Sequence, residues 1–293
     1  MLKILNIIWV TFVLIGFTSC EDVVQIKLDE GSKIYVIDAF VNDLRQNQII
    51  KITTNDTYFS NRQAPPVSDA QVVLNDLTSS NSYTFNYIGN GNYTYTIGIN
   101  DTIAKVNHQY RLDVSIDGNI YTSTSIQSRP SKIDSISVLP NDGGFGPPGD
   151  KDEFICLLFA KDKADNNPDY YWIKTFRNDT LFQSPNDLNI CIDGTGGAVQ
   201  NANSDSIYFT PPATFLGFKS YRKNNTCKVE VHSVNKETYL FFVQAFNQIN
   251  NGGLFATTPE NVKTNIISPT DAKTKAVGRF SMASVATSSV LIK

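Results

Sequence analysis

The sequence has few of the residues from which catalytic and metal sites are most often built. It contains two histidines, His108 and His232, and neither has a second histidine or a cysteine at the spacing of a zinc site. No Gly-x-Ser-x-Gly turn of the kind that carries a nucleophilic serine is present. The glycine-rich stretch 194–197 lacks the Lys-Ser/Thr ending of a phosphate-binding loop, so we expect a surface loop there. These absences favour a protein that is not an enzyme and that holds no metal or cofactor.

An excess of positive charge is also absent. The chain has 25 Lys and Arg against 28 Asp and Glu, which gives a formal net charge of −3 at pH 7. Nucleic-acid binding depends on clustered basic side chains that neutralise phosphates. We therefore exclude nucleic acid as a partner.

Methionine is scarce, and the composition is that of strands and turns. The chain has only 2 Met but 13 Tyr and 18 Phe, and Thr, Ile, Val, Asn and Ser are abundant. β-Branched and aromatic residues favour strands, and Asn and Ser favour the turns between them. We expect a mainly β fold.

The apolar run near the N-terminus is too short to cross a membrane. It follows Lys3, extends over residues 4–17 and ends in Thr18, Ser19 and Cys20, whereas a spanning helix needs about 20 apolar residues. This pattern predicts a signal peptide over residues 1–19. Residues 17–20 resemble the bacterial lipobox, so we expect lipid on Cys20 and a membrane tether over residues 20–32. The alternative is an ordinary signal peptide in which Cys20 is incidental.

Three more cysteines leave the disulfide pattern open. Cys156 lies in the apolar run 154–159 and is typical of a buried thiol, whereas Cys191 and Cys227 lie near predicted loop ends. Export would place them in a compartment that permits disulfides. Cys191 and Cys227 could therefore form a bridge or remain thiols.

Two β domains are expected, with a boundary near residue 130. Seven short strands separated by turn residues predict an immunoglobulin-like sandwich over residues 33–130. Their predicted ranges are 33–41, 48–53, 70–75, 82–87, 93–99, 110–116 and 120–124. Tight hairpins are expected at residues 89–92 and 117–119, where Gly, Asn and Asp tolerate positive φ.

The second domain, residues 131–293, is expected to be β-rich with one amphipathic helix. Strands are predicted from residue 133 and at 153–160, 170–177, 206–209, 228–233 and 289–293. The helix should extend over residues 236–249, with Asn235 as its N-cap and residues 251–253 as its stop. Its apolar stripe of Tyr239, Val243, Phe246 and Ile249, widened by Leu240 and Phe242, is expected to pack on the second sheet.

A few polar and aromatic residues are candidates for contacts. Tyr58, Phe59 and Arg62 lie in a long polar loop, residues 55–66, and could anchor a partner or ligand or fold back onto the sheet. The oxygen-rich stretch 162–169 suggests calcium but is more typical of a polar turn. Asp38 lies inside the apolar strand 33–41, and a structural role is expected for it.

The order of these segments resembles a known family. The segments that carry the resemblance are Cys20-Glu21-Asp22, 35–41, Tyr58-Phe59 leading through Pro65-Pro66 to 70–72, 110–114, 170–172, 235–239, 251–253 leading to Pro259, and 278–281. On these segments the chain resembles the Bacteroidota lipoproteins classified as domain of unknown function 4249.

The resemblance implies a location and a partner but no catalytic residues. Such lipoproteins are expected in the outer membrane, beside SusC-like TonB-dependent receptors, so the resemblance implies an accessory or ligand-capture subunit of a transporter. Whether it faces the periplasm or the cell surface is left open. The alternative is a structural or adhesive surface lipoprotein whose sandwich domains act as spacers.

Overall fold

The computed structural model describes residues 31–57, 60, 62–101, 103–142, 150, 152–161, 168–184, 187–192, 216, 220–252, 257–258 and 260–293. The predicted signal peptide, Cys20, Tyr58, Phe59 and the predicted strand 206–209 lie outside these residues, as does most of the oxygen-rich stretch 162–169. The chain divides into two compact units, Met1–Ser32 with Thr57–Ser60 and Lys33–Asp56 with Asn61–Lys293. The second unit contains every strand and helix described below.

All seven strands predicted before residue 130 are present. They are β1 (Ile34–Asn42), β2 (Gln48–Thr54), β3 (Gln71–Asp76), β4 (Ser82–Gly89), β5 (Asn92–Tyr95), β6 (Gln109–Ile116) and β7 (Asn119–Ile126). Alternate side chains along them point into one apolar core, in which Tyr35, Tyr93, Tyr110 and Tyr121 are almost fully buried. Burying one large apolar side chain stabilises a fold by roughly 1.5–3 kcal/mol, and this core therefore holds the sandwich-like part together.

The two predicted hairpins have the backbone that the sequence requires. Asn90 and Gly91 join β4 to β5, and Asp117 and Gly118 join β6 to β7, all with positive φ. Gly, Asn and Asp adopt such angles at low cost, and the resulting turns match the twist of paired strands. These short turns determine which strands become neighbours.

The remainder of the described chain is also mainly β. Its strands are β8 (Lys132–Pro140), β9 (Glu153–Lys161), β10 (Tyr170–Arg177), β11 (Thr180–Leu181), β12 (Asn189–Ile192), β13 (Tyr221–Arg222), β14 (Thr226–Val234) and β15 (Lys275–Leu291). Within the described residues, one sheet has the order β11-β10-β14-β15-β1-β2-β5-β4-β3-β6-β7, with β12 beside β10. A second sheet has the order β13-β9-β8. The predicted strand 289–293 is only the end of the 17-residue β15.

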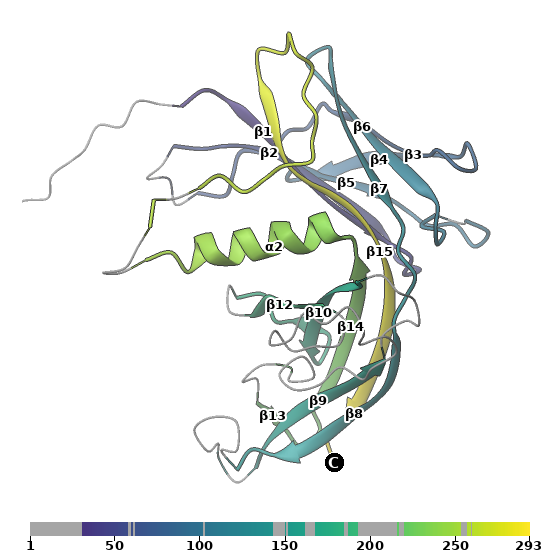
Figure 1. Ribbon diagram of the computed structural model, residues 1–293, viewed down its shortest axis with the longest axis vertical. Coiled ribbons are helices and arrows are strands. Elements are labelled where there is room, and N and C mark those ends of the chain that lie inside the picture. The colour runs from purple at the N-terminus through teal and green to yellow at the C-terminus, as the bar shows by residue number, and fades with distance from the viewer. Residues whose placement is uncertain are drawn as a thin grey trace, which may run out of the picture. The chain divides into compact units, whose positions relative to one another are not determined.

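Strand β15 belongs to both parts of the chain. Its first half pairs in parallel with β1, from Lys275 opposite Ile34 to Ala283 opposite Asn42, and its second half pairs antiparallel with β14. Figure 1 shows it as one long yellow strand. A boundary near residue 130 assigns all of β15 to the second domain, whereas its first half is a strand beside β1.

One glycine allows β15 to approach β1. Gly278 has a φ of +126°, and a Cβ at this position would overlap the carbonyl oxygen of Ile37 on β1. A residue with a side chain would therefore strain the backbone and push the two strands apart. Gly278 precedes Arg279, whose side chain becomes important in the site described below.

A second apolar cluster contains Cys156, Cys227 and Tyr221. A hydrogen bond to Cys227 and burial raise the pKa of Cys156. The bridge considered between Cys191 and Cys227 is not formed. Cys191 lies opposite Tyr171 of β10 and Cys227 lies opposite Arg177, which is six positions further along the same strand. Six strand positions span about 20 Å, whereas a disulfide joins Cα atoms about 4–7 Å apart.

Helix α2 (Lys236–Ile249) occupies the predicted range and begins at the predicted cap. The Asn235 side chain accepts a hydrogen bond from the Thr238 amide, which satisfies one of the open N–H groups of the first turn. The helix packs on β10, β12 and β15, and its Phe242 ring contacts Trp172 of β10. Of the predicted stripe, Leu240, Phe246 and Ile249 are exposed. The core contact is therefore narrower than the stripe indicates.

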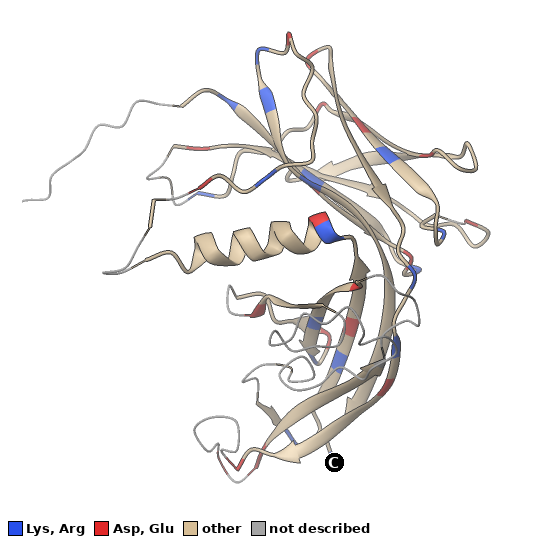
Figure 2. Ribbon diagram, viewed as in Figure 1, with Lys and Arg blue, Asp and Glu red and all other residues tan. Residues whose placement is uncertain are grey.

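Charge is confined to one end of this helix. Lys236 and Glu237 in its first turn are its only charged residues, and Figure 2 shows the rest of the ribbon in tan. Among the described residues, no helix has the length and apolarity needed to cross a membrane.

Candidate functional site

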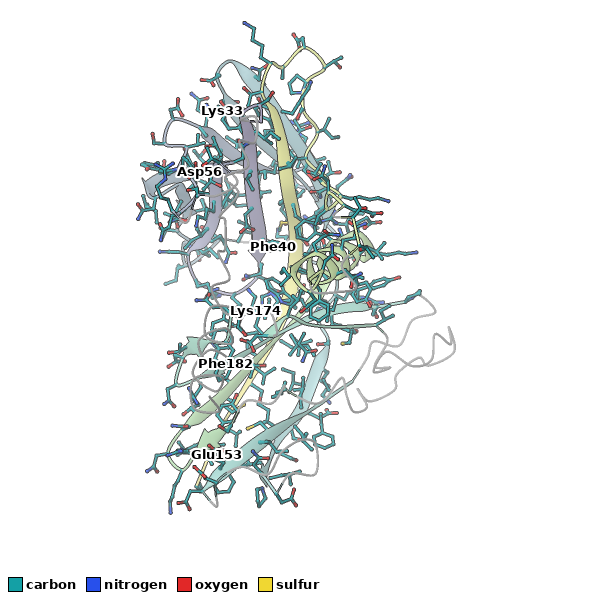
Figure 3. The ribbon with its side chains drawn as sticks, turned by 90° about the vertical axis from the view of Figure 1, so that its left-hand side faces the viewer. Lys33, Phe40, Asp56, Glu153, Lys174 and Phe182 are labelled. Atoms are coloured by element: carbon teal, nitrogen blue, oxygen red, sulfur yellow. The ribbon has the colours of Figure 1, made fainter. Side chains whose placement is uncertain are left out.

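A cavity of about 570 Å³ lies between helix α2 and the face of the sheet formed by β1, β10 and β15. Residues 181–184 and 187–188, which follow β10, supply another wall. Figure 3 labels three residues that line it from different elements, Phe40, Lys174 and Phe182. The volume lies in the range typical of pockets for small ligands.

The side chains of β1 reach this cavity because strand residues alternate between the two faces of a sheet. Ile37 and Ala39 are buried in the sandwich core. Val36, Asp38 and Phe40 point the opposite way and line the cavity. One strand therefore stabilises the fold with one face and forms the site with the other.

The same alternation applies to β10. Tyr171 is buried in the second apolar cluster, whereas Trp172 and Lys174 line the cavity. The Lys174 ammonium lies 4.0 Å from the centroid of the Trp172 ring. Stacking of this cation on the indole holds the long lysine side chain against the cavity wall.

An aromatic cluster fixes the helix to the sheet at the edge of the cavity. The rings of Phe40 and Phe242 stack with centroids 5.4 Å apart and an interplanar angle of 16°. The Trp172 ring lies 4.6 Å from Phe242 and 5.4 Å from Phe40. Because three elements contribute one ring each, the aromatic surface is rigid and is formed before any ligand arrives.

Two groups of opposite charge lie on the cavity wall without forming an ion pair with each other. Desolvation by the surrounding protein raises the pKa of Asp38, while Lys51 and Lys174 lower it. Burial lowers the pKa of Lys174, while Glu230 and Asp38 raise it. Asp38 is nevertheless exposed to solvent.

Asp187 also lines the cavity, and its carboxylate accepts hydrogen bonds from the Ser184 amide at 2.8 Å and the Ser184 hydroxyl at 2.6 Å. Arg279 is the fourth charged residue of the cavity and is only 5% exposed. Its Nε donates to Thr238 Oγ1 at 3.2 Å, and its Nη2 donates to Thr238 Oγ1 at 3.0 Å and to Asn235 Oδ1 at 3.1 Å. These acceptors are neutral, so they orient the guanidinium without neutralising it. Burial lowers the pKa of Arg279 to about 10, and Glu237 raises it. The group is charged at neutral pH.

The two histidines have structural partners and do not line the cavity, although the His232 ring lies 5.3 Å from the Trp172 ring. His108 Nδ1 lies 2.8 Å from Asp76, whose carboxylate also accepts hydrogen bonds from Thr78 and Ser79. His232 Nε2 lies 3.1 Å from Glu230. Burial lowers the pKa of His232 to about 4, although Glu230 raises it, so this ring is neutral at pH 7. Within the described part of the chain, no cluster of His, Cys, Asp and Glu is placed to hold a metal.

The residues expected to make contacts are not those that the structure brings together. Arg62 is exposed and forms an ion pair with Asp56 at 3.0 Å, and Tyr58 and Phe59 lie outside the described residues. Asp38, expected to be structural, lines the cavity.

Sequence reasoning missed five residues that form the cavity, namely Phe40, Trp172, Lys174, Phe242 and Arg279. A signal was available in two strands. In 36–40 and 172–174, charged and aromatic residues alternate with buried apolar ones, which indicates a strand whose second face is neither core nor ordinary surface.

Comparison with known proteins relates nearly the whole chain to one family. A family described as "Domain of unknown function (DUF4249)" matches residues 21–289. No curated protein matches the chain. A solved structure described as "Structural insight into host cell surface retention of a 1.5-MDa bacterial ice-binding adhesin" aligns with 10% sequence identity and a TM-score of 0.19. The alignment covers 89% of this chain and 65% of the adhesin chain, just under two thirds of that protein.

Proposed function

The chain belongs to the DUF4249 family, and from the cavity that its fold forms we propose that it is a non-catalytic ligand-capture protein. The observation that carries this proposal is the cavity of about 570 Å³ with aromatic and charged walls. Rigid aromatic surfaces and a few oriented polar groups are what small-molecule sites generally consist of. Of the charged groups of the wall, Lys174, Arg279 and Asp187 are each oriented by a neighbouring ring or by neutral hydrogen-bonding groups, an arrangement suited to holding a ligand.

We infer binding rather than catalysis, although the wall holds two groups with shifted pKa values, Asp38 and Lys174. A general acid or base must have a titratable group near neutral pH within reach of the substrate. Of the two histidines, neither lines the cavity. Glu230 hydrogen-bonds His232, and its pKa is about 2, because the hydrogen bonds of His232 and Lys228 outweigh its desolvation. This carboxylate is ionised and engaged, so it is poorly suited to transferring protons.

We also propose where the protein works and with what partner. Residues 17–20 support acylation at Cys20, which would hold the chain at the outer membrane. The family resemblance supports a place beside a SusC-like TonB-dependent receptor, to which the captured ligand would be passed. In this proposal the sandwich part holds the cavity near the receptor.

A dye test examines capture by the cavity. The probe is 1-anilinonaphthalene-8-sulfonate, which carries fused rings and an anionic group and fluoresces when it leaves water. Ala245 lies on α2 and lines the cavity, so Ala245→Phe should fill part of it and weaken dye binding at least tenfold. Asn247→Phe adds the same side chain to the exposed surface of the same helix and should leave binding unchanged. Equal affinity in both variants would contradict the proposal.

A second experiment tests the location and the partner. Detergent extraction of native membranes, followed by affinity purification and mass spectrometry, should recover a SusC-like barrel with the parent chain. Cys20→Ser should abolish palmitate incorporation and release the chain from the membrane. If the protein is instead a structural spacer, the purification should recover no barrel. Deletion of the protein should then alter attachment or envelope integrity and leave nutrient uptake unchanged.

A further inference from the structure

We propose that the cavity binds a zwitterion with an apolar side chain, such as a short peptide whose amino and carboxyl ends are both free. This inference rests on the proposed capture function and specifies its ligand. It is carried by charges of both signs, the acidic Asp38 and Asp187 and the basic Lys174 and Arg279, in a cavity whose other walls are largely aromatic and aliphatic.

Three of these charges form no close ion pair with any described residue, although Lys51 lies opposite Asp38 and Glu230 lies opposite Lys174 in the strand register. Among the described residues, Asp38, Lys174 and Arg279 form no ion pair within 4.0 Å, although other charged residues nearby do, such as Lys228 with Glu230 at 3.1 Å. The Arg279 guanidinium bonds only to neutral oxygens, through its Nε and Nη2 atoms. A charge in an apolar setting is costly unless something pairs with it. A ligand that brings opposite charges would supply the missing pairing.

Different strands carry Asp38 and Lys174. Lys174 lies on β10, and two strands, β14 and β15, separate β10 from β1, which carries Asp38. The Lys174 ammonium is also held over the Trp172 ring. The two groups are therefore attached at different places on the wall, although they are close enough to influence each other electrostatically. A ligand with two separated charges of opposite sign matches this arrangement.

Other ligand classes match less well. An anion would be attracted by Lys174 and Arg279 but repelled by Asp38. A cation would be attracted by Asp38 but repelled by Lys174 and Arg279. A neutral sugar could stack on the aromatic rings but would leave all three charges without a partner. For a zwitterion, the ligand's carboxylate would bind Lys174 and Arg279, its ammonium would bind Asp38, and its apolar side chain would contact Phe40, Trp172 and Phe242.

The chain supplies its own reporter for this test. Its two tryptophans are Trp9, in the predicted signal peptide, and Trp172, in the cavity. Trp9→Phe makes Trp172 the only tryptophan of the full chain, so any ligand-dependent fluorescence change reports the cavity. The chain purified in detergent would be titrated with the dipeptide Phe-Leu, with N-acetyl-Phe-Leu, with Phe-Leu amide and with maltotriose.

The dipeptide with free ends should bind at least tenfold more tightly than either blocked form and than maltotriose. In Asp38→Asn, N-acetylation of the dipeptide should no longer weaken binding, whereas amidation still should. In Lys174→Met, amidation should no longer weaken binding, whereas N-acetylation still should. Lys228→Met and Asp113→Asn serve as matched controls, because these residues form ion pairs of their own and do not line the cavity. In both control variants, N-acetylation and amidation should each still weaken binding.

The outcomes separate this inference from the proposed function. If the blocked dipeptides bind the parent chain as tightly as the free one, or if maltotriose binds more tightly, the zwitterion inference is wrong. The comparison of ligands on the parent chain gives this answer even if a variant fails to fold. If Ala245→Phe still weakens dye binding in that case, the capture function stands, and the ligand belongs to another class.

Discussion

Replacing Phe242 by alanine should show how far the aromatic contact holds helix α2 on the sheet. Phe242 is 7% exposed and stacks on Phe40 and Trp172. Truncating a buried Phe to Ala costs about 3–5 kcal/mol, and the adjoining cavity places this site at the lower end. We therefore expect the free energy of unfolding to fall by about 3 kcal/mol. In a chain of this size, that corresponds to a decrease in Tm of about 6–12 °C.

The measurement is urea or thermal unfolding followed by circular dichroism, with Phe246→Ala as the matched control. Phe246 lies on the same helix but is 38% exposed, so its truncation should cost less than about 1 kcal/mol. Phe242→Ala should also weaken binding of the naphthalene sulfonate dye, because one wall of the cavity is lost. Equal destabilisation by the two substitutions, or a cost below about 1 kcal/mol at Phe242, would refute this account of the packing.

Three further substitutions test the backbone, the helix cap and a buried ion pair. Gly278→Ala should destabilise by several kcal/mol, since a Cβ there would overlap Ile37 and φ is +126°; unchanged urea denaturation would be incompatible with the β1–β15 pairing. Asn235→Ala should cost about 1–2 kcal/mol, because it removes the N-cap of α2, and a loss below about 0.3 kcal/mol would argue against the cap. Because burial holds the pKa of His232 at about 4, below the usual histidine value of 6.5, the folded state binds this proton less readily than the unfolded state. Stability should therefore be complete above about pH 6.5 and decline as the pH falls toward 4, and His232→Gln should flatten that decline in unfolding curves measured at each pH. If His232→Gln leaves the pH dependence of the unfolding free energy unchanged, groups other than His232 cause the decline. The contribution of Glu230 is distinguishable, because it is lost at lower pH, from pH 4.5 toward 2.

Local features of the fold were predictable because local chemistry determines them. Strands β1 to β7 alternate apolar and polar side chains, and Asn90-Gly91 and Asp117-Gly118 adopt the positive φ that tight hairpins require. Helix α2 could be bounded from its cap and its periodicity. Short strands without such patterns, including β11, β12 and β13, were missed, since each has only two to four residues.

The cavity could not be located from the sequence, because it depends on pairings between distant segments. Residues 36–40, 172–174, 241–249 and 278–279 become neighbours only when β15 joins β1 on one side and β14 on the other. The aromatic residues at positions 58–59 gave a more obvious signal, because aromatic residues within a polar stretch are easy to recognise along a chain. Nothing in the local pattern says which polar residue of a strand will face a helix.

The sequence alone determined the mainly β class, the hairpins, the limits of helix α2 and the expectation of an exported, lipid-anchored chain. These features depend on residues close together in the chain, where backbone preferences and side-chain periodicity act directly. Only the tertiary structure decided that β15 spans two parts of the fold and that Asp38, Lys174 and Arg279 share one cavity. The physical reason is that strand pairing is made between backbones, which carry little information about their partners until the whole sheet has formed.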